Sequence, residues 1–381
     1  MSEFLKLMEN WNGYAALPDR QINEAAIARV VDLVANKDRL PSHRWEYLMR
    51  EVITTSDFPT LFGVAIDRQM LAAYKAVMAD WRSYVKVSSL PNFNTHLREK
   101  LYGNDNLLPE VAEKGEYLVA DVGTGHYSIA LKKWGRQFDI SWEALINDSM
   151  GAFADIPARF AMAAVRSEAR AVTDLYASAA GPDVGLFGAP IADVDGQNVT
   201  NLGALPLTIG NLQLTLALMA QQTDPNGEPI SVRGVHLVVP PALEFTMRAI
   251  LTSALVQWTE VGAGGGIPVP TANIIPQMGL KGHVDPYLPV VDVSANNDGT
   301  WYLFAEPSAG AALEFSFLRG HESPEICMKS SDKVAVGGGP ISAFEGDFAT
   351  DNIFYRVRIV KGSLFLDPRA AYAQIGTSTE T

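Results

Sequence analysis

The sequence contains a single cysteine, Cys327, among its 381 residues. One thiol cannot build an internal disulfide framework and fits a reducing cytoplasm, so we interpret Cys327 as a lone buried thiol. No apolar run approaches the ~18 residues of a membrane-spanning helix. The N-terminus lacks the basic start and apolar core of a signal peptide. The sequence therefore predicts a protein without membrane association.

Positive charge is also scarce. The sequence has 30 Lys and Arg residues against 43 Asp and Glu residues, which gives a formal net charge of -13. Proteins that bind nucleic acid through counterion release need dense Lys and Arg, so the composition argues against that class. The composition does not exclude a protein that encloses nucleic acid without binding it tightly. Solubility alone is an equally good explanation of the charge.

Motifs for catalysis or metal binding are missing as well. The glycine clusters match no dinucleotide fingerprint, and the sequence has no phosphate loop, no H-E-x-x-H and no G-x-S-x-G elbow. Residues 193–198, "DVDGQN", begin like a calcium loop but lack its later acidic ligands, which favours a turn. The six histidines share no ligand spacing, and His236 is interpreted as a core or edge residue. We predict no catalytic residue, no cofactor and no metal site.

Helical periodicity dominates the first 105 residues. Apolar side chains recur at i, i+3, i+4 spacing in residues 23–40 and again in residues 67–85, with the turn-like "TTSDFP" between them. No Pro- or Ser-rich linker separates this part from the rest. The spacing predicts a helical N-terminal region.

Residues 106–142 change character, and within them residues 116–141 contain two extended runs separated by Gly123 and Gly125 that indicate a β-hairpin. Its flanks are charged and offer little apolar surface to bury within the chain. An isolated hairpin is marginal in water, so the pattern suggests an intermolecular partner. The charged residues expected to make such contacts are Glu113, Lys114, Glu116, Lys132, Lys133 and Arg136.

A long helix follows between residues 147 and 180. Met162, Val165, Ala169, Val172 and Tyr176 follow a 3-4-3-4 spacing that predicts one buried face. The other faces are predicted to carry the charged side chains, which are Arg166, Glu168, Arg170 and Asp174. About 25 residues would extend roughly 38 Å, long enough to cross a whole domain.

The remaining sequence alternates helices and strands. A Gly/Ala-rich connector over 181–210 precedes a helical run, and residues 235–239 form a strand that leads into a helix through Pro240 and Pro241. A glycine-rich loop, "TEVGAGGGIPVPT", comes next. Further strands are predicted at "WYLFA" and "AALEFSFL", and residues 353–359 alternate as a half-buried strand. The fold class is α+β.

The order of these elements resembles tailed-phage major capsid proteins of the Hong Kong 97 fold, most like the Mu-like major head subunit branch. The resemblance runs from about residue 50 to 375, and its most specific part is a strand, then I-S-x-E-x-L-x-x-D, then the long helix. The other segments that carry it are "GVHLVVPPALEFTMRAIL", "NIIPQMGL", "WYLFAEP", "LEFSFLRGHESPEICMKS" and "FYRVRIVKGSLFLDPRAAY".

The resemblance implies four parts. These are an N-terminal helical arm (1–105), an E-loop hairpin laid across a neighbouring subunit (106–138), a peripheral domain with the long spine helix (139–204 and 341–381) and an axial domain (205–340). Gly264 and Gly265, in the glycine-rich loop, would lie near the centre of each hexamer and pentamer. No covalent crosslink is predicted, because neither an acceptor asparagine nor a promoting glutamate is identified.

The implied function is that of a major head protein that assembles into hexamers and pentamers of an icosahedral shell. The shell would enclose double-stranded DNA without sequence-specific binding, and the protein would assemble in the host cytoplasm and reside in the virion. Scaffolding, portal and decoration proteins are its expected partners. The alternatives are an encapsulin-like nanocompartment shell, a soluble enzyme with a dispersed active site, and a tail or adaptor protein.

Overall fold

The computed structural model divides the chain into two compact units. Unit 1 comprises Met1–Val77, Trp134–Ala164 and Ser323–Ile359, and unit 2 comprises Met78–Lys133, Val165–Glu322 and Val360–Thr381. The residues that the structure describes are 70–72, 74–76, 80–102, 108, 110–111, 113–117, 123–141, 150–259, 268–334, 336–337 and 346–376. The helix predicted over 23–40 lies outside them.

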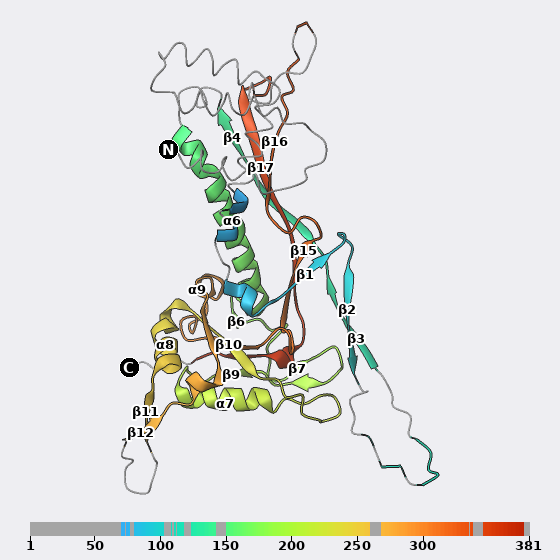
Figure 1. Cartoon of the computed structure of the whole chain (residues 1–381), viewed down its shortest axis with the longest axis vertical. Helices are drawn as coiled ribbons and strands as arrows, with labels where there is room; N and C mark the ends of the chain where they lie inside the picture. The colour runs from blue at the N-terminus through green and yellow to red at the C-terminus, as the bar shows by residue number, and fades with distance from the viewer. Residues whose placement is uncertain are drawn as a thin grey trace, which may run out of the picture. The chain divides into compact units, whose positions relative to one another are not determined.

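Unit 2 is built around a five-stranded mixed sheet in the order β13-β10-β14-β18-β9. Strands β10 and β9 of this sheet are labelled in Figure 1. Every residue of its central strand β14 is buried, as a strand covered on both faces requires. The predicted strands at 235–239 and 301–305 are thereby confirmed. The bounds are Lys281–Val284 for β13, Gly234–Val239 for β10, Trp301–Ala305 for β14, Ala371–Gln374 for β18 and Leu202–Gly203 for β9.

Aromatic side chains form the core on this sheet. Tyr176 lies edge-on to Tyr302 with ring centroids 4.9 Å apart, and Phe187 lies 5.5 Å from Tyr302. Helix α7 (Ile209–Ala220) packs against β10 and β18, and the Thr208 side chain caps its first turn by accepting a hydrogen bond from the Asn211 amide. After β10, Pro241 opens the short helix η4 (Pro241–Leu243), which leads into α8 (Glu244–Thr252) as predicted.

A second set of strands in unit 2 centres on β15 (Leu313–Leu318). Strand β1 (Lys86–Leu90) pairs with it in parallel, and the second half of β17 (Asn352–Phe365) pairs with it antiparallel. A small apolar cluster underlies these strands and comprises Leu90, Ile129, Leu131 and Val360, with Leu318 and Leu364 at its edge.

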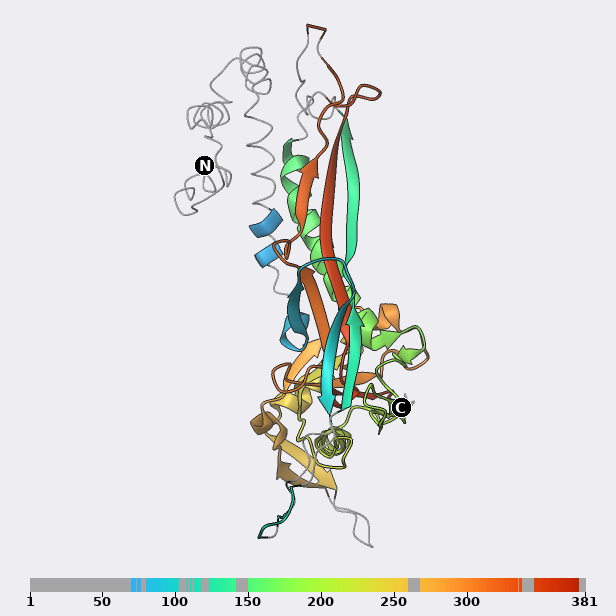
Figure 2. The ribbon, with the colours of Figure 1, turned by 90° about the vertical axis from the view of Figure 1, so that its right-hand side faces the viewer.

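In unit 1, the first half of β17 pairs antiparallel with β16 (Glu325–Met328) and also pairs with β4 (Lys132–Ser141), which runs beside it in Figure 2. Ile353, Tyr355, Val357 and Ile359 are buried, which confirms the predicted alternation. Phe138 stacks on Tyr355 at 5.0 Å and on Phe160 at 4.6 Å. Cys327 is exposed on β16, so its interpretation as a buried thiol is wrong.

The predicted long helix is confirmed as α6 (Met150–Tyr176), whose 27 residues extend about 40 Å. Val165, Val172 and Tyr176 are buried as predicted. Glu168 is the exception, because its side chain is fully buried beside the Arg82 guanidinium rather than on an outer face. A buried charge needs such a partner, and the partner lies 86 residues away in sequence.

Three further predictions need correction. The helix-rich region ends before residue 86, because β1 and β2 (His96–Tyr102) are strands. The 181–210 connector contains the short strand pairs β5–β6 and β7–β8 and the sheet strand β9. The segment beyond α8 forms an antiparallel pair, β11 with β12, on either side of the glycine-rich loop.

The remaining elements are short. Their bounds are Asp80–Ser83 for η3, Ala177–Ser178 for β5, Gly181–Pro182 for β6, Ile191–Ala192 for β7, Asn198–Val199 for β8, Leu255–Thr259 for β11, Pro268–Ala272 for β12, Ile275–Met278 for η5, Leu288–Val291 for α9 and Pro368–Ala370 for η7. Residues 70–72 and 74–76 are helical, within the helix predicted over 67–85.

The buried Lys361 makes the stability of unit 2 depend on pH. Burial lowers the pKa of its ammonium group to about 8, partly offset by Glu168 and Asp174. The unfolded chain therefore binds more protons between roughly pH 8 and 10.5, so stability rises with pH across that window. We expect the wild type to gain up to about 3 kcal/mol relative to Lys361→Met between pH 7 and 10.5. Calorimetric melting of both proteins across this range measures the difference, and parallel curves would contradict it.

Candidate functional site

A two-stranded ribbon projects from unit 2, formed by β2 and β3 (Gly123–Ile129), which lie side by side in Figure 2. The strands pair antiparallel from His96 opposite Ile129 to Tyr102 opposite Gly123. The hairpin predicted around Gly123 and Gly125 is therefore wrong in its pairing. Both glycines lie within β3, whose partner is the unpredicted β2 of the same chain rather than a strand of another subunit.

The two faces of the ribbon differ in chemistry. Because successive side chains alternate, Arg98 and Lys100 share one face with Tyr127, and these three are partly buried. Leu97 and Leu101 lie on the opposite face, where they are 55% and 65% exposed. The ribbon thus directs its basic side chains toward the rest of unit 2, while its leucines and Glu99 face outward.

The first ionic contact of the ribbon, here named the inner anchor, joins Arg98 to Glu314 of β15. The Arg98 Nη2 and Nε atoms donate to Glu314 Oε1 at 2.6 and 2.9 Å, and Nε also reaches Oε2 at 3.1 Å. The Ser88 hydroxyl donates to the same carboxylate at 2.5 Å and lies 2.6 Å from Ser316. The side chain of Glu314 is fully buried. Burial alone would raise the pKa of Glu314, but hydrogen bonds from Arg98 and Ser88 hold it below its usual value.

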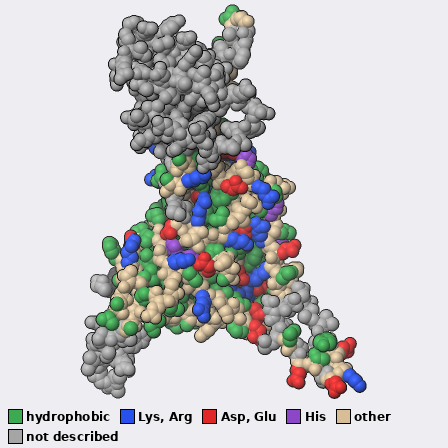
Figure 3. Space-filling view, in the orientation of Figure 1, with side chains coloured by type: hydrophobic (Ala, Val, Ile, Leu, Met, Phe, Trp, Pro, Cys, Tyr) green, Lys and Arg blue, Asp and Glu red, His purple; other side chains and the backbone are tan. Residues whose placement is uncertain are grey.

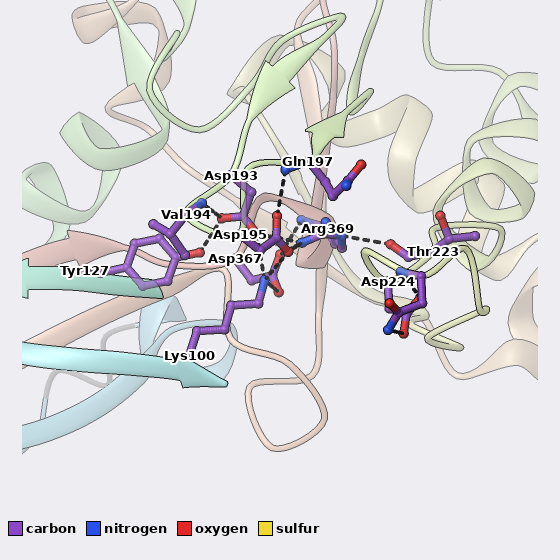
Figure 4. A network of polar contacts seen from close by, with 11 residues as sticks. Lys100, Tyr127, Asp193, Val194, Asp195, Gln197, Thr223, Asp224, Asp367 and Arg369 are labelled. Atoms are coloured by element: carbon purple, nitrogen blue, oxygen red, sulfur yellow. Dashed lines mark hydrogen bonds and ion pairs between the residues drawn. The ribbon is translucent and has the colours of Figure 1, made fainter. Parts of the chain in front are cut away.

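The second contact, the outer anchor, gathers three carboxylates around two cations (Figure 4). Lys100 Nζ donates to Asp193 at 2.7 Å and to Asp367 at 2.6 Å, and Arg369 Nη1 donates to Asp193 at 2.6 Å. Asp195 lies 2.8 Å from the same Arg369 nitrogen. Since Asp193 and Asp195 are almost fully buried, these pairs offset the cost of removing their charges from water.

Tyr127 adds a neutral donor to the outer anchor, because its hydroxyl donates to Asp193 at 2.5 Å. Burial raises the pKa of Tyr127 far above its ordinary value, and the Asp193 hydrogen bond raises it further. The pKa of Asp193 is lowered, because hydrogen bonds from Lys100 and Tyr127 outweigh its burial. The phenol therefore stays protonated and the carboxylate stays ionised, which fixes the direction of the bond.

Local sequence explains how these groups meet. In the β7–β8 turn, Asp195 accepts a hydrogen bond from the Gln197 amide, and Gly196 adopts a φ of +81°, as a tight turn requires. This confirms the turn predicted over 193–198. A Cβ at Gly125 would lie 2.7 Å from the Val194 side chain, so only glycine lets β3 approach this turn closely.

The predicted contact residues are placed as follows. Glu113, Lys114 and Glu116 are exposed in the segment between β2 and β3, where acidic side chains gather at the lower right of Figure 3. Lys132, Lys133 and Arg136 are exposed on β4, with Lys133 Nζ 6.0 Å from the Phe93 ring centroid. Gly264 and Gly265 lie outside the described residues.

The residues that form the two anchors were not predicted. The signal in the sequence is the alternation of "HLREKLY", which places Arg98 and Lys100 on one strand face. Their carboxylate partners lie between 93 and 267 residues away in the chain, so local patterns could not identify them. Sequence reasoning interpreted residues 193–198 as a turn but missed that the turn's carboxylates form ion pairs with Lys100 and Arg369.

Other kinds of site are not found in the described part of the chain. None of its groups of three or more His, Cys, Asp or Glu could hold a metal ion. No helix there is long and apolar enough to cross a membrane. His236 is buried in β10, as expected of a core residue.

Removing the guanidinium of the inner anchor should be costly. We expect Arg98→Met to destabilise the subunit by about 3 kcal/mol at neutral pH, because Glu314 is left buried without its cation. The loss should shrink as the pH falls below the ordinary carboxylate range and through the lowered pKa of Glu314, since a protonated Glu314 no longer needs a cation. Urea denaturation at matched protein concentration measures both effects.

Arg248→Met is the matched control. It breaks an exposed Arg–Glu pair with Glu244 on α8, where a change within about 0.5 kcal/mol is expected. An equal loss of unfolding free energy from both substitutions would mean that the inner anchor stabilises the subunit no more than an exposed ion pair does.

The sequence and structure were compared with known proteins. A family model described as "Phage capsid protein" matches residues 127–374, from β3 to the end of β18. No curated protein sequence matches the chain significantly.

Several solved structures are similar in fold at low identity. A structure from Gordonia phage Cozz has a TM-score of 0.47 at 13% identity, covering 77% of this chain and 85% of that chain. The mature capsid of bacteriophage PhiM1 has a TM-score of 0.46 at 11% identity, covering 79% and 88%. A virus-like particle from Pyrococcus furiosus has a TM-score of 0.43 at 11% identity, covering 82% and 99%.

Proposed function

Because the chain belongs to the phage capsid protein family and is thus a subunit of a shell, we propose that it builds hexamers and pentamers of a closed icosahedral head around double-stranded DNA. The single observation that carries this proposal is the family match over residues 127–374. It covers the end of β3, the long helix, the central sheet of unit 2, and strands β15, β16 and β17 of the second sheet. Capsid proteins of this family belong to the virion, and we propose that this one assembles in the host cytoplasm.

The proposed division of labour keeps the predicted four parts with one adjustment. The E-loop is taken as the whole ribbon and its intervening segment, residues 96–129, since β2 and β3 form one paired unit. Its outward leucines and the exposed charges Glu113, Lys114 and Glu116 are the surfaces proposed to contact a neighbouring copy, as are Lys132, Lys133 and Arg136 on β4. The loop carrying Gly264 and Gly265 is proposed to lie near the centre of each capsomer.

The finer identity is also a proposal. The arrangement of a strand, a long helix and a strand–helix domain supports the Hong Kong 97-type fold. Within that fold, we propose that the chain belongs to the Mu-like branch. We propose that the chain has no catalytic role, as expected of a structural family. Scaffolding, portal and decoration proteins are its proposed partners, and the net charge of -13 supports a shell that encloses DNA without sequence-specific contacts. An encapsulin-like compartment is the less favoured alternative, because the matching family is that of phage capsids.

Negative-stain electron microscopy with light scattering, applied to the full chain expressed alone, tests the proposal. We expect closed shells or capsomer-sized rings. If only a small oligomer forms, the measurement is repeated with the neighbouring genes co-expressed, because a separate scaffold can be required. A small discrete oligomer under both conditions would contradict a shell function.

The ribbon can be tested separately from the fold. We expect that replacing residues 103–122 by Asn-Gly leaves a folded subunit that no longer forms closed shells. Tyr102 and Gly123 are directly opposite in the ribbon, so a two-residue turn can join them while both anchors remain. Circular dichroism checks folding and electron microscopy checks assembly. Normal shells from this variant would show that the segment between the strands is dispensable.

As a control, Asn-Gly can replace residues 225–226 in the exposed turn between the bridged residues Thr223 and Pro229. That change should leave assembly intact, so a defect there would point to a general sensitivity to loop changes.

A further inference from the structure

Two buried histidines of unit 2 contact each other and connect two carboxylates. His236 Nδ1 on β10 lies 2.9 Å from His283 Nε2 on β13. The outer nitrogens both face carboxylates, since His283 Nδ1 lies 2.8 Å from Asp80 Oδ1 and His236 Nε2 lies 3.1 Å from Glu306 Oε2. The result is a continuous chain, Asp80–His283–His236–Glu306, that links η3 to the end of β14.

The pair is shielded from water. His236 is fully buried and His283 is 7% exposed. The ring of Tyr84 covers them, with its centroid 5.3 Å from that of His283 and 5.4 Å from that of Phe304. An unmatched N–H or lone pair is costly in such surroundings, so the number of protons in the chain matters.

That number follows from the geometry. An ionised carboxylate only accepts hydrogen bonds, so both outer nitrogens must carry N–H groups. The contact between the rings needs one donor and one acceptor, which brings the total to three protons on four nitrogens. A neutral pair has only two protons and leaves one of the three contacts unmade. A doubly charged pair has four, and its two inner N–H groups face each other.

We propose that His236 and His283 form a binding site for a single proton, and that this proton ties Asp80 and the entry of β1 to the central sheet of unit 2. The bound state carries one positive charge between two carboxylates. This inference goes beyond the proposed shell function, since it concerns how the elements within one subunit are held together.

Ser83 indicates which ring carries the shared proton. Its hydroxyl donates to the Asp80 carbonyl at 2.7 Å, so toward His283 Nε2, 3.5 Å away, its oxygen can only accept. A proton on Nε2 thus has two acceptors, the Ser83 oxygen and His236 Nδ1. This places both N–H groups on His283 and leaves His236 neutral. Burial and then the neighbouring His283 lower the pKa of His236, which agrees with this assignment.

The charged and titratable groups around the pair come from each neighbouring element. Asp80 comes from η3, Tyr84 from the segment before β1, Lys281 from β13 and Glu306 from the end of β14, while Asp285 faces Tyr84. Despite slight opposition from burial, hydrogen bonds from Lys281 and His236 lower the pKa of Glu306. Glu306 therefore remains an acceptor across the pH range in which histidines titrate.

The chain acts on the first residues of unit 2. Asp80 precedes Trp81, whose ring lies 4.8 Å from Phe315, and Arg82, which pairs with Glu168 at 3.4 Å. Strand β1 begins four residues later, in parallel with β15. Gain or loss of a proton should therefore destabilise residues 80–90 locally, so that this segment opens more often while the rest of unit 2 stays folded.

Hydrogen–deuterium exchange of the full chain, with exchange corrected for its intrinsic pH dependence, tests the proposal. We expect the protection of a peptide covering residues 80–90 to pass through a maximum between pH 5 and 9 and to fall about fivefold on either side, the effect of one lost hydrogen bond. Light scattering at each pH verifies that the assembly state is unchanged. Protection that varies in one direction only between pH 5 and 9 would overturn the proposal.

Two amide variants test the number of protons directly, because each replaces a carboxylate that can only accept by an amide that can donate. In Asp80→Asn, the amide can donate to His283 Nδ1, so a neutral pair becomes fully hydrogen-bonded. Glu306→Gln does the same from the opposite end. Both should abolish the loss of protection at alkaline pH while keeping the loss at acidic pH. Asp80 is 61% exposed on its side chain, so its substitution should not prevent folding.

His126→Gln is the matched control, because His126 is an exposed histidine of the ribbon. It should leave the wild-type profile unchanged. If the two amide variants keep the alkaline loss of the wild type, the single-proton site is wrong.

Discussion

The Glu314 carboxylate is buried inside unit 2, and the Arg98 guanidinium is the group that makes this position tenable. A carboxylate taken out of water costs several kcal/mol unless it is paired and its remaining lone pairs are satisfied. Arg98 supplies the charge and Ser88 supplies a further hydrogen bond. Because these three residues belong to β15, β2 and β1, one contact fixes the mutual position of three strands. An apolar core could stabilise them equally well, and we expect the ion pair to add specificity for one orientation.

The outer anchor makes that orientation more secure. Lys100 lies two residues beyond Arg98 on the same strand face and binds Asp193 and Asp367. Two ionic contacts along one strand leave the ribbon little freedom to rotate or slide. For the proposed contact with a neighbouring copy this matters, because a surface that is already ordered loses less conformational entropy on association. Gly125 contributes to the same arrangement, because the absence of a side chain there lets β3 approach the β7–β8 turn.

Periodicity predicted the elements that bury one face. The alternation of residues 353–359, the 3-4-3-4 spacing of α6 and the apolar run of β14 were all interpreted correctly. Strand β2 was missed because its sequence is as polar as that of a loop, and its apolar residues face outward. Glu168 was misplaced for a related reason, since its stabilising partner Arg82 is distant in sequence.

The candidate site was harder to predict than the fold. Ion pairs leave no periodic trace, and Arg98 is separated from Glu314 by 216 residues. The single-sequence pattern could show that "HLREKLY" has a basic face, but not which acid that face binds. The charged flanks of the ribbon were easier to notice and proved to be exposed. The order of the elements indicated the family, whereas the anchor residues were not predicted, because order depends on many weak patterns and an ionic contact on a few exact pairings.

The same ion pairs bear on the proposed relation to DNA. The composition offers 30 cationic side chains, and the structure commits several of them to internal carboxylates. Arg98, Lys100 and Arg369 each bind a buried or half-buried acid, and Arg82 pairs with Glu168. A cation held in this way cannot also neutralise a phosphate, so it releases no counterion on contact with DNA. Affinity for a polyanion should therefore be weaker than the count of Lys and Arg suggests. A wall built from such subunits would confine a genome while leaving it unbound.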